Sequence, residues 1–468
     1  MAYGYWKSAR AEREAVFHLF FRTNPFEGGY TIAAGLQYVT DYLTGFRFSE
    51  EDIEYLSQLE GNDEQKLFDP EFLEHLAQLK LQVDVDAVPE GTVVFPHEPF
   101  VRVKGPILQC QILETALLNF VNFQSLIATK AARIVSATGG DPVLEFGLRR
   151  AQGIDGALAA SRAAYIGGCS ATSNVLAGKL FGIPVRGTHA HSWVMSFDDE
   201  MSAFETYAAA MPNNCVFLVD TYDTIEGVRK AIKVGLKLRN LGHEMAGIRL
   251  DSGDLAYLSI DARRLLDEAG FPDAAIVASN DLDEGIIANL KEQDAKIAVW
   301  GVGTKLVTAY DQPALGGVYK LGAMKNDSGE WEPKVKLSEQ VIKTSTPGML
   351  QVRRFCDSAG PIADMIYNEL GSEPADAAMI DPLDPTRRRQ FDRSTSSDDL
   401  LIPVVRAGEL VQTAENLDTI RSRADRQLNM FHTGIRRHLN PHQFPVGLEQ
   451  NLHDLKKKLI LKARGVAT

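Results

Sequence analysis

Short apolar runs in this sequence are repeatedly followed by hydroxyl, carboxylate, imidazole and glycine residues, which are groups that bind phosphates and sugars. In βα barrels the functional groups gather at the carboxyl ends of the strands, so we expect these segments to meet at one face. Ser, Thr and Asp are also the preferred helix N-caps, which explains one or two of the segments equally well. The segments are Gly187-Thr188-His189-Ala190-His191, Asp220-Thr221-Tyr222-Asp223, Asp251-Ser252-Gly253-Asp254, Ser279-Asn280-Asp281 and Gly301-Val302-Gly303-Thr304.

Two of these segments could hold a phosphorylated sugar. Gly303 lets backbone N–H groups approach an anion, and Thr304 adds a hydroxyl donor at a helix start. Asp251 and Asp254, near Arg249, could bind ribose hydroxyls or a magnesium ion carried in with the substrate. A helix cap with an ion pair is the structural alternative for these carboxylates, and a tight turn is the alternative for the glycines.

His189 and His191 could act as a general base or as a nucleophile that accepts a phosphoryl group. A purely structural role is the alternative for either histidine. Zinc binding is not expected, because no cysteine cluster or His-x3-His helix accompanies them.

Arg149 and Arg150 end a predicted strand at 143–148 and could grip a carboxylate or phosphate through paired N–H donors. A surface salt-bridge network is the alternative. A local arginine pair is the more informative in a chain whose net charge is −13.

The composition describes a soluble globular chain of two or three folding units. It has 468 residues, 45% hydrophobic and 24% charged. The net charge of −13 repels nucleic acid and anionic lipid, so neither is an expected partner. The sequence shows no signal peptide, and no run of roughly 18 apolar residues. The four cysteines are too scattered for a disulfide framework, and we expect a cytoplasmic protein.

From about residue 140 the sequence alternates short apolar strands with amphipathic helices, which is typical of a parallel sheet. Strands are predicted at 182–185, 216–219, 246–250, 275–278 and 297–300. The N-terminal part predicts helices at 11–21 and 31–43, antiparallel strands between 81 and 103, and a buried helix at 107–134. We therefore expect an N-terminal α+β domain at 1–105, a βα-barrel catalytic domain at 106–318, and a C-terminal segment at 319–468 that completes the peripheral domain.

Taken together, these segments resemble the nicotinate phosphoribosyltransferase family over nearly the whole chain. Further matching stretches are Gly4-Tyr5-Trp6, Asn24-Pro25-Phe26-Glu27-Gly28-Gly29, Gly147-Leu148-Arg149-Arg150-Ala151-Gln152-Gly153, Thr172-Ser173-Asn174-Val175 and Gly316-Gly317-Val318-Tyr319-Lys320. The resemblance implies an α/β fold: the irregular βα barrel of type II phosphoribosyltransferases, with an α+β sandwich-like domain from N- and C-terminal segments. It also implies a ligase-class reaction of NAD biosynthesis, in which nicotinate, phosphoribosyl pyrophosphate and ATP give nicotinate mononucleotide. Mg2+ is the ion that the resemblance implies.

The resemblance also assigns roles to residues. The family's phosphorylated histidine, in a Gly-Thr-x-Ala-His motif, corresponds to His191 rather than His189. Thr188, Arg249 and Thr304 correspond to positions that line the nicotinate and phosphoribosyl site, and Arg149 is expected to face the pyridine carboxylate. Further binding candidates are Arg150, Asp251, Ser252 and Gly303. A homodimer is implied, in which an N-terminal segment of one subunit completes the neighbour's site.

One departure from the family concerns the N-terminus. Family members carry a Thr-Asp-Leu-Tyr-like segment just before the stretch that reads Met1-Ala2-Tyr3-Gly4 here, and its tyrosine stacks on the pyridine ring. We therefore expect Met1 to be an internal methionine, and loss of the tyrosine to weaken substrate binding by about 1 kcal/mol or more. Two alternatives stay open: a nicotinamide phosphoribosyltransferase, and a non-catalytic barrel that binds a sugar phosphate.

Overall fold

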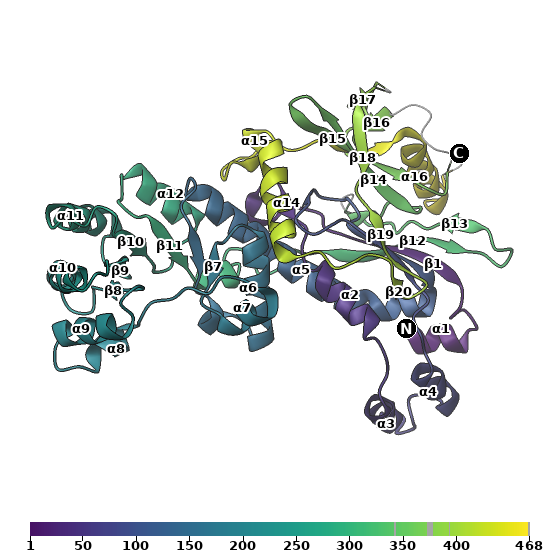
Figure 1. Cartoon of the computed structure of the whole chain (residues 1–468). Helices are drawn as coiled ribbons and strands as arrows, with labels where there is room; N and C mark the ends of the chain where they lie inside the picture. The colour runs from purple at the N-terminus through teal and green to yellow at the C-terminus, as the bar shows by residue number, and fades with distance from the viewer. Residues whose placement is uncertain (341–342, 372–377, 393, 467–468) are drawn as a thin grey trace. The chain divides into compact units, whose positions relative to one another are not determined.

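The computed structural model describes residues 1–340, 343–371, 378–392 and 394–466. The chain divides into two compact units (Figure 1). The terminal unit consists of Met1–Ser125 and Ala314–Thr468, and the central unit is Leu126–Pro313. The sequence predicts domain boundaries at 105/106 and 318/319, and these boundaries remain a prediction.

The central unit is built on a six-stranded sheet with the strand order β7-β6-β11-β10-β9-β8. Every pairing in it is parallel, and a parallel bridge between Thr172 and Val185 adds a further position beside β7. This confirms the α/β class expected from the sequence. The strands are β6 (Val143–Glu145), β7 (Ala171–Thr172), β8 (Val216–Leu218), β9 (Gly247–Leu250), β10 (Ala275–Ala278) and β11 (Val299–Val302).

The predicted strands at 216–219, 246–250 and 275–278 match β8, β9 and β10 to within one residue, because continuous apolar runs suit strands buried on both faces. The prediction of 297–300 was two residues early, since Gly301 and Val302 also pair with β6. The predicted strand at 182–185 reduces to the bridge at Val185. Gly182 there ends a helix in the left-handed conformation, at φ 72°, and Pro184 has no N–H to donate.

The helices of the central unit begin with strand-end carboxylates. Asp223, Asp254 and Asp283 each accept a hydrogen bond from a backbone N–H in the first turn of the helix that follows. Helix capping is therefore the observed role of Asp254. The elements are α6 (Ile154–Ile166), α7 (Val175–Phe181), α8 (His191–Met195), α9 (Glu200–Ala210), α10 (Thr224–Asn240), α11 (Leu255–Glu268), α12 (Glu284–Glu292), α13 (Thr304–Val307) and the 3-10 turn η2 (Leu148–Arg150).

The terminal unit contains a seven-stranded antiparallel sheet that joins the two ends of the chain, in the order β13-β12-β1-β5-β3-β19-β20. Its N-terminal strands are β1 (Glu14–Phe20), β3 (Asp84–Ala87) and β5 (Val101–Pro106). Its C-terminal strands are β12 (Val318–Lys325), β13 (Trp331–Pro333), β19 (Ile402–Arg406) and β20 (Glu409–Leu410). The expectation that N- and C-terminal segments share one sheet is confirmed.

The predicted helix at 11–21 is wrong, because this segment forms β1, the strand that pairs with both β12 and β5. All its residues except Glu14 are buried, so the apolar run has no exposed face to reveal its period. The predicted helix at 31–43 begins later, after the short strand β2. The remaining elements are α1 (Ala2–Lys7), η1 (Pro25–Glu27), β2 (Thr31–Ile32), α2 (Leu36–Thr44), α3 (Glu50–Gln58), α4 (Pro70–Ala77), β4 (Val93–Val94), α5 (Ile107–Ala137), α14 (Leu417–Met430), α15 (Thr433–Arg436) and α16 (Gln450–Ala463).

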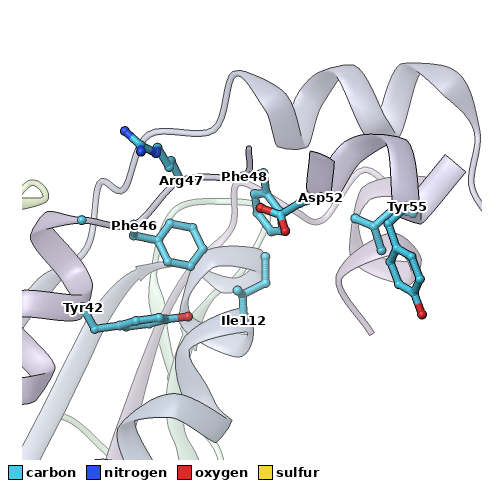
Figure 2. A pocket seen from close by; sticks show the side chains of 9 residues that line it. Tyr42, Phe46, Arg47, Phe48, Asp52, Tyr55 and Ile112 are labelled. Carbon is cyan, nitrogen blue, oxygen red and sulfur yellow. The ribbon is translucent and has the colours of Figure 1, made fainter. Parts of the chain in front are cut away.

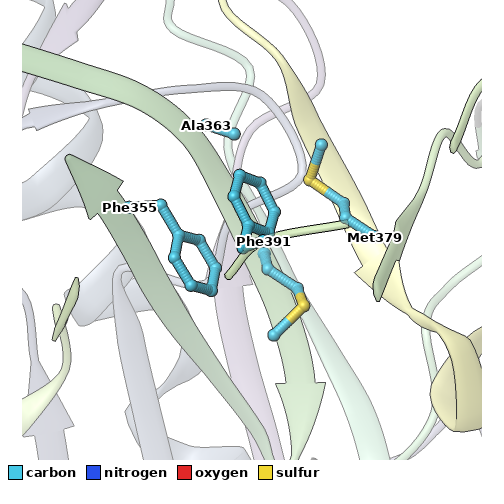
Figure 3. Packing of buried hydrophobic residues seen from close by; sticks show 5 residues of the cluster. Phe355, Ala363, Met379 and Phe391 are labelled. Atoms are coloured by element: carbon cyan, nitrogen blue, oxygen red, sulfur yellow. The ribbon is translucent and has the colours of Figure 1, made fainter. Parts of the chain in front are cut away.

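A second sheet in the terminal unit has the order β17-β16-β21-β15-β14-β18. Figure 3 shows the apolar cluster on one side of it, where the rings of Phe355 and Phe391 stack with centroids 3.9 Å apart. Ala363 and Met379 pack into the same cluster. The strands are β14 (Leu350–Asp357), β15 (Gly360–Asn368), β16 (Ala378–Ile380), β17 (Arg388–Gln390), β18 (Ser396–Asp399) and β21 (Val446–Glu449). In the described part of the chain, no helix has the length and apolar character needed to span a membrane.

Candidate active site

The strand-end residues of β8, β9 and β10 meet in one hydrogen-bonded group in the central unit. Arg249, on β9, is its centre: Nη1 donates to the Thr188 hydroxyl at 2.9 Å, Nη2 to Asp251 Oδ1 at 2.7 Å, and Nε to the Ser279 hydroxyl at 2.8 Å. All three nitrogens of one planar guanidinium are used, which fixes its orientation. The structure thus brings together Thr188, Arg249 and Asp251, as the strand-end positions predicted.

Asp251 lies between Arg249 and His191. Its Oδ1 also accepts a hydrogen bond from Ser279, and its Oδ2 lies 3.6 Å from His191 Nε2. Burial by itself would raise the pKa of Asp251, but the Ser279 hydrogen bond and the charge of Arg249 outweigh it and hold the pKa below its usual value. Asp251 is therefore ionised at neutral pH and places a negative charge beside the imidazole.

His191 is the first residue of α8 and is partly open to solvent, with its side chain 38% exposed. Its Nδ1 lies 3.1 Å from the Thr221 hydroxyl, and its Nε2 faces the carboxylates of Asp251 and Asp220. One ring nitrogen is therefore held by a hydroxyl while the other faces two acids. This arrangement suits a histidine that exchanges a proton or accepts a phosphoryl group.

His189 has a different environment, although it is only two residues away. It is buried against Phe204 and Tyr207, and its Nε2 accepts the backbone N–H of Leu218 at 3.2 Å. Burial, with the charges of Arg249 and His191, lowers the pKa of His189 to about 4, against a hydrogen bond to Ala190 that opposes the shift. His189 is therefore a neutral structural residue, which agrees with the choice of His191.

Asp220, in a segment expected at the functional face, was given no role by sequence reasoning, but the structure places it in the site. Its side chain is 1% exposed, and Oδ2 accepts hydrogen bonds from the Asp251 N–H at 2.8 Å and the Ser252 hydroxyl at 2.6 Å. Its Oδ1 is buried without a hydrogen-bond partner among the described residues and lies 4.0 Å from His191 Nε2. A buried acceptor of this kind needs a proton donor or a cation. The signal was available, since Asp220 follows β8 as Asp251 follows β9.

Ser252 orients Asp220 through the hydrogen bond just described. Thr304 is the half-buried first residue of α13, which has four residues. Gly303 precedes it, and a Cβ there would lie 3.0 Å from the Phe146 carbonyl oxygen. A Cβ at Gly301 would lie 2.8 Å from the Phe146 ring. Packing therefore explains the glycines of this turn, because β6 and β11 approach each other closely there. This explanation holds whether or not the turn binds a ligand.

Arg149 and Arg150 lie in η2, both exposed. Neither guanidinium makes a hydrogen bond or ion pair among the described residues, so the predicted salt-bridge alternative is not observed. The turn that carries them is held by Glu145, a buried residue that sequence reasoning missed. Glu145 accepts hydrogen bonds from the Gly147 N–H, the Ser161 hydroxyl and the Thr172 hydroxyl. Two exposed guanidinium groups on a fixed turn are free to bind an anionic ligand.

The ring of Phe146, between Glu145 and this turn, was also missed. The Arg249 guanidinium lies 5.7 Å from its ring centre. Phe146 is partly exposed, and it connects the arginine centre to the glycine turn after β11. An aromatic face in this position offers a flat surface for a ring-shaped ligand.

A separate cationic group lies in the terminal unit and includes Lys320 of the Gly-Gly-Val-Tyr-Lys segment. Burial lowers the pKa of Lys456 to about 8, and burial with the charges of Lys456 and Arg22 lowers the pKa of His97 to about 4. Arg22 Nε is buried without a hydrogen-bond partner in the described ranges. We call Arg22, Lys320, Lys336 and Lys456, together with the neutral His97, the cationic group, because the charge of Arg22 acts on both His97 and Lys320, and the charge of Lys336 also acts on Lys320.

A hollow of about 350 Å³ lies in the terminal unit, and Figure 2 shows the side chains that line it. Its wall is mainly aromatic and aliphatic, with Tyr42, Phe46, Phe48 and Ile112 turned towards it. Asp52, on its rim, is already engaged as the partner of Ser49 in a helix-capping box. The hollow contains none of the residues predicted from the sequence, and its one acid is used for folding, so we do not assign it as the active site.

Comparisons with known proteins agree over the full length. The sequence matches the nicotinate phosphoribosyltransferase N-terminal domain over residues 1–122, the nicotinate phosphoribosyltransferase family over 142–358 and the C-terminal domain over 350–456. It is 43% identical over 474 residues to a nicotinate phosphoribosyltransferase of Bacillus subtilis (strain 168), with coverage of 98% of this chain and 94% of that protein.

Comparison with solved structures supports the same family. The crystal structure of human nicotinic acid phosphoribosyltransferase superposes with a TM-score of 0.86 at 33% identity, covering 98% of both chains. A nicotinate-nucleotide pyrophosphorylase from Pyrococcus furiosus, at 22% identity and 92% coverage of both chains, shares the fold with a TM-score of 0.70. The expected fold, an irregular α/β barrel of the type II phosphoribosyltransferases with a second α+β unit, is confirmed.

Proposed function

Because the chain belongs to the nicotinate phosphoribosyltransferase family, we propose that it forms nicotinate mononucleotide and pyrophosphate from nicotinate and phosphoribosyl pyrophosphate, as a step of NAD salvage. The observation that carries this proposal is the strand-end group in which Arg249 orients Thr188 and Asp251, while Asp251 faces His191. Displacement of pyrophosphate from the anomeric carbon has a loose, cation-like transition state. Catalysis therefore depends on positioning the ring nitrogen and neutralising the leaving group.

Nicotinate binding is assigned to the region around Phe146. Arg149 supplies a guanidinium that has no partner in the described parts of the chain for the pyridine carboxylate, and Arg150 supplies a second one. The Phe146 ring provides an aromatic face, and Thr188, already held by Arg249, supplies a fixed hydroxyl. Arg249, Asp251, Gly303 and Thr304 are assigned to the phosphoribosyl part of the site.

His191 is the proposed acceptor of the γ-phosphoryl group of ATP. In the tautomer whose Nδ1–H donates to Thr221, the Nε2 lone pair is free to attack phosphorus. The new N–P bond forms as the bond to the ADP oxygen breaks, and ADP leaves with that electron pair. Water later cleaves the N–P bond, which releases phosphate and restores the imidazole. ATP hydrolysis is thereby coupled to the synthetic reaction, as in a ligase.

The residues around His191 fit a magnesium ion. Mg2+ prefers oxygen ligands and keeps several waters, and the carboxylates of Asp220 and Asp251 would hold it. The buried Oδ1 of Asp220, which has no hydrogen-bond partner in the part of the chain described, is the observation that supports this fit. A bound magnesium ion would neutralise phosphate charge.

The cationic group supplies the terminal unit with positive charge suited to a phosphorylated substrate, in a chain of net charge −13. A homodimer in which one subunit completes its neighbour's site would bring such charges into use. We also propose that the protein acts in the cytoplasm, and its four free cysteines agree with a reducing compartment.

The test is formation of nicotinate mononucleotide by the purified chain with phosphoribosyl pyrophosphate and magnesium, with and without ATP. We expect product from nicotinate and a higher product yield with ATP. Equal or faster turnover of nicotinamide would favour the sister activity on the amide. Absence of product from both, with phosphoribosyl pyrophosphate still bound, would favour a non-catalytic sugar-phosphate-binding protein.

A further inference from the structure

Glu98, in the terminal unit, is a buried acid that the proposed reaction does not use. Its residue is 1% exposed, and its Oε2 accepts the backbone N–H of Phe95 at 2.9 Å. Its Oε1 is buried and receives no hydrogen bond from an N–H or a hydroxyl in the described chain. An ionised carboxylate in this position would have only one donor for two oxygens.

The group that faces Glu98 is a salt bridge that is already complete. Arg354 on β14 and Asp364 on β15 are cross-strand partners, and Arg354 Nε donates to Asp364 Oδ1 at 2.8 Å. Arg354 Nη2 donates to Asp364 Oδ2 and to the Val93 carbonyl, and Nη1 lies 3.4 Å from Gln427 Oε1. The guanidinium thus directs its N–H groups to Asp364, Val93 and Gln427.

This ion pair is sealed from water. Asp364 is 0% exposed, and the rings of Phe95, Phe431 and Phe444 lie 5.2–5.9 Å from the guanidinium carbon of Arg354. The neighbouring pair in the same register, Phe355 and Ala363, points into the apolar cluster on the other side of the sheet (Figure 3). Oε1 of Glu98 is buried on both sides and does not reach bulk solvent.

The buried charges around Glu98 do not balance if both acids are ionised. Two carboxyl groups, Glu98 and Asp364, share one guanidinium in a closed interior, so two carboxylates would leave one buried negative charge without compensation. Burial, followed by the charge of Asp364 and its hydrogen bond, raises the pKa of Glu98 well above its usual value, while the charge of Arg354 and the Phe95 N–H oppose the shift. The charged groups that face Glu98 are Asp364 from β15 and Arg354 from β14.

We propose that Glu98 keeps its proton in the native protein and donates it to Asp364, so that a carboxyl–carboxylate hydrogen bond fastens the turn after β4 to β15 and makes the terminal unit sensitive to alkali. This inference concerns the fold and does not depend on the proposed reaction. The turn also carries His97 of the cationic group, so the shared proton is a positioning element for that neighbour.

The pH dependence follows from proton linkage. In the unfolded chain Glu98 titrates near its ordinary value of about 4.3, whereas in the native chain its pKa is raised. The stabilisation is therefore complete below the unfolded pKa and is lost as pH rises through the folded pKa. Between these two values the native state holds one proton more than the unfolded state. The unfolding constant of the terminal unit should increase about tenfold for each pH unit in that range, beyond the contribution of all other groups.

The experiment compares the wild-type chain with Glu98→Gln, whose amide can donate to Asp364 at every pH, and with Glu12→Gln at an exposed acid as the matched control. Urea unfolding of the full chain is followed at rising pH from pH 5 upward. We expect the extra tenfold per pH unit in wild type and Glu12→Gln, and its absence in Glu98→Gln. The same alkaline slope in Glu98→Gln would overturn the proposal.

A second measurement does not depend on whether the variant folds. Infrared spectroscopy of the native wild-type chain at neutral pH should show the carbonyl stretch of a protonated carboxyl group, which carboxylates lack. The band should persist in Glu12→Gln. A wild-type spectrum without it would show that Glu98 is ionised and would contradict the shared proton directly.

Discussion

Two regions of this molecule each combine two carboxyl groups with one arginine, but they use this combination for opposite roles. In the central unit, Asp220, Asp251 and Arg249 surround a histidine whose side chain is 38% exposed, and one carboxylate oxygen of Asp220 has no donor among the residues that the structure describes. In the terminal unit, Glu98, Asp364 and Arg354 are enclosed by aromatic rings. The first arrangement keeps unsatisfied bonding capacity beside solvent, where a ligand can use it. The second encloses its two carboxyl groups away from water, so only a proton can balance their excess negative charge.

The difference shows how to separate a site from a core when both contain buried charge. A carboxylate that lacks a partner beside an open histidine is available for chemistry, because a substrate or ion can complete it. A carboxyl group that lacks a partner and is enclosed by phenylalanine rings is instead held in its protonated form. Burial and shifted pKa values alone would rank Glu98 above Asp251, so solvent access and neighbouring groups must decide.

The largest expected effect comes from His191→Ala. The variant should lose ATP hydrolysis by on the order of 10³-fold or more, because the phosphoryl acceptor is gone, while ATP-independent formation of nicotinate mononucleotide stays reduced but detectable. His243→Ala is the matched control, since His243 is partly exposed, lies outside the strand-end group, and its Nδ1 lies 2.8 Å from Asn213 Oδ1. Phosphate release and product formation are measured together. Unchanged ATP hydrolysis in His191→Ala would contradict the phosphohistidine assignment.

Arg354→Met tests the enclosed group. Removing the guanidinium takes away the only positive charge that the described residues place beside the two buried acids Glu98 and Asp364, which should destabilise the fold by about 3–5 kcal/mol. The adjacent residue gives the control: Arg353 pairs with Asp399 at 2.8 Å in a partly exposed bridge, so Arg353→Met should cost about 1 kcal/mol or less. Urea unfolding at neutral pH measures both. Equal losses in the two variants would mean that enclosure does not distinguish them.

Arg249→Lys tests the open group. Lysine keeps the charge but cannot direct N–H groups to Thr188, Asp251 and Ser279 at once, so kcat/KM for phosphoribosyl pyrophosphate should fall about 100-fold. Arg239→Lys, at an exposed pair with Glu244, should leave the kinetics unchanged. Unfolding midpoints close to wild type in both variants would assign the loss to the site. Wild-type kinetics in Arg249→Lys would show that charge alone suffices.

Much of the central unit could be predicted from the sequence, because a buried parallel strand is a continuous apolar run and its next residues lie at the functional face. That reasoning found β8, β9 and β10 and placed Thr188, Arg249, Asp251 and His191 at strand ends. It failed for β1, whose apolar run suits a buried helix or strand equally.

The remaining site residues depend on tertiary contacts that a single sequence does not display. Glu145 matters because Ser161 and Thr172 approach it, and Phe146 because β11 packs beside it. The proton on Glu98 follows from a register on β14 and β15 that pairs Arg354 with Asp364. No local sequence pattern around Glu98 indicates that a single guanidinium lies beside two acids.

The smallest effect separates two acids within a single strand-end segment. Asp251 is bonded to Arg249 and faces His191, whereas Asp254 accepts the Tyr257 N–H at 3.0 Å and caps α11. Asp254→Ala should therefore cost about 1 kcal/mol of stability and leave kcat within about twofold of wild type. Asp223→Ala, which removes the corresponding cap of α10, is its control and should behave alike. If Asp254→Ala instead lost activity at unchanged stability, the ribose-binding alternative for this carboxylate would replace the cap, and the open group would be larger than the arginine centre indicates.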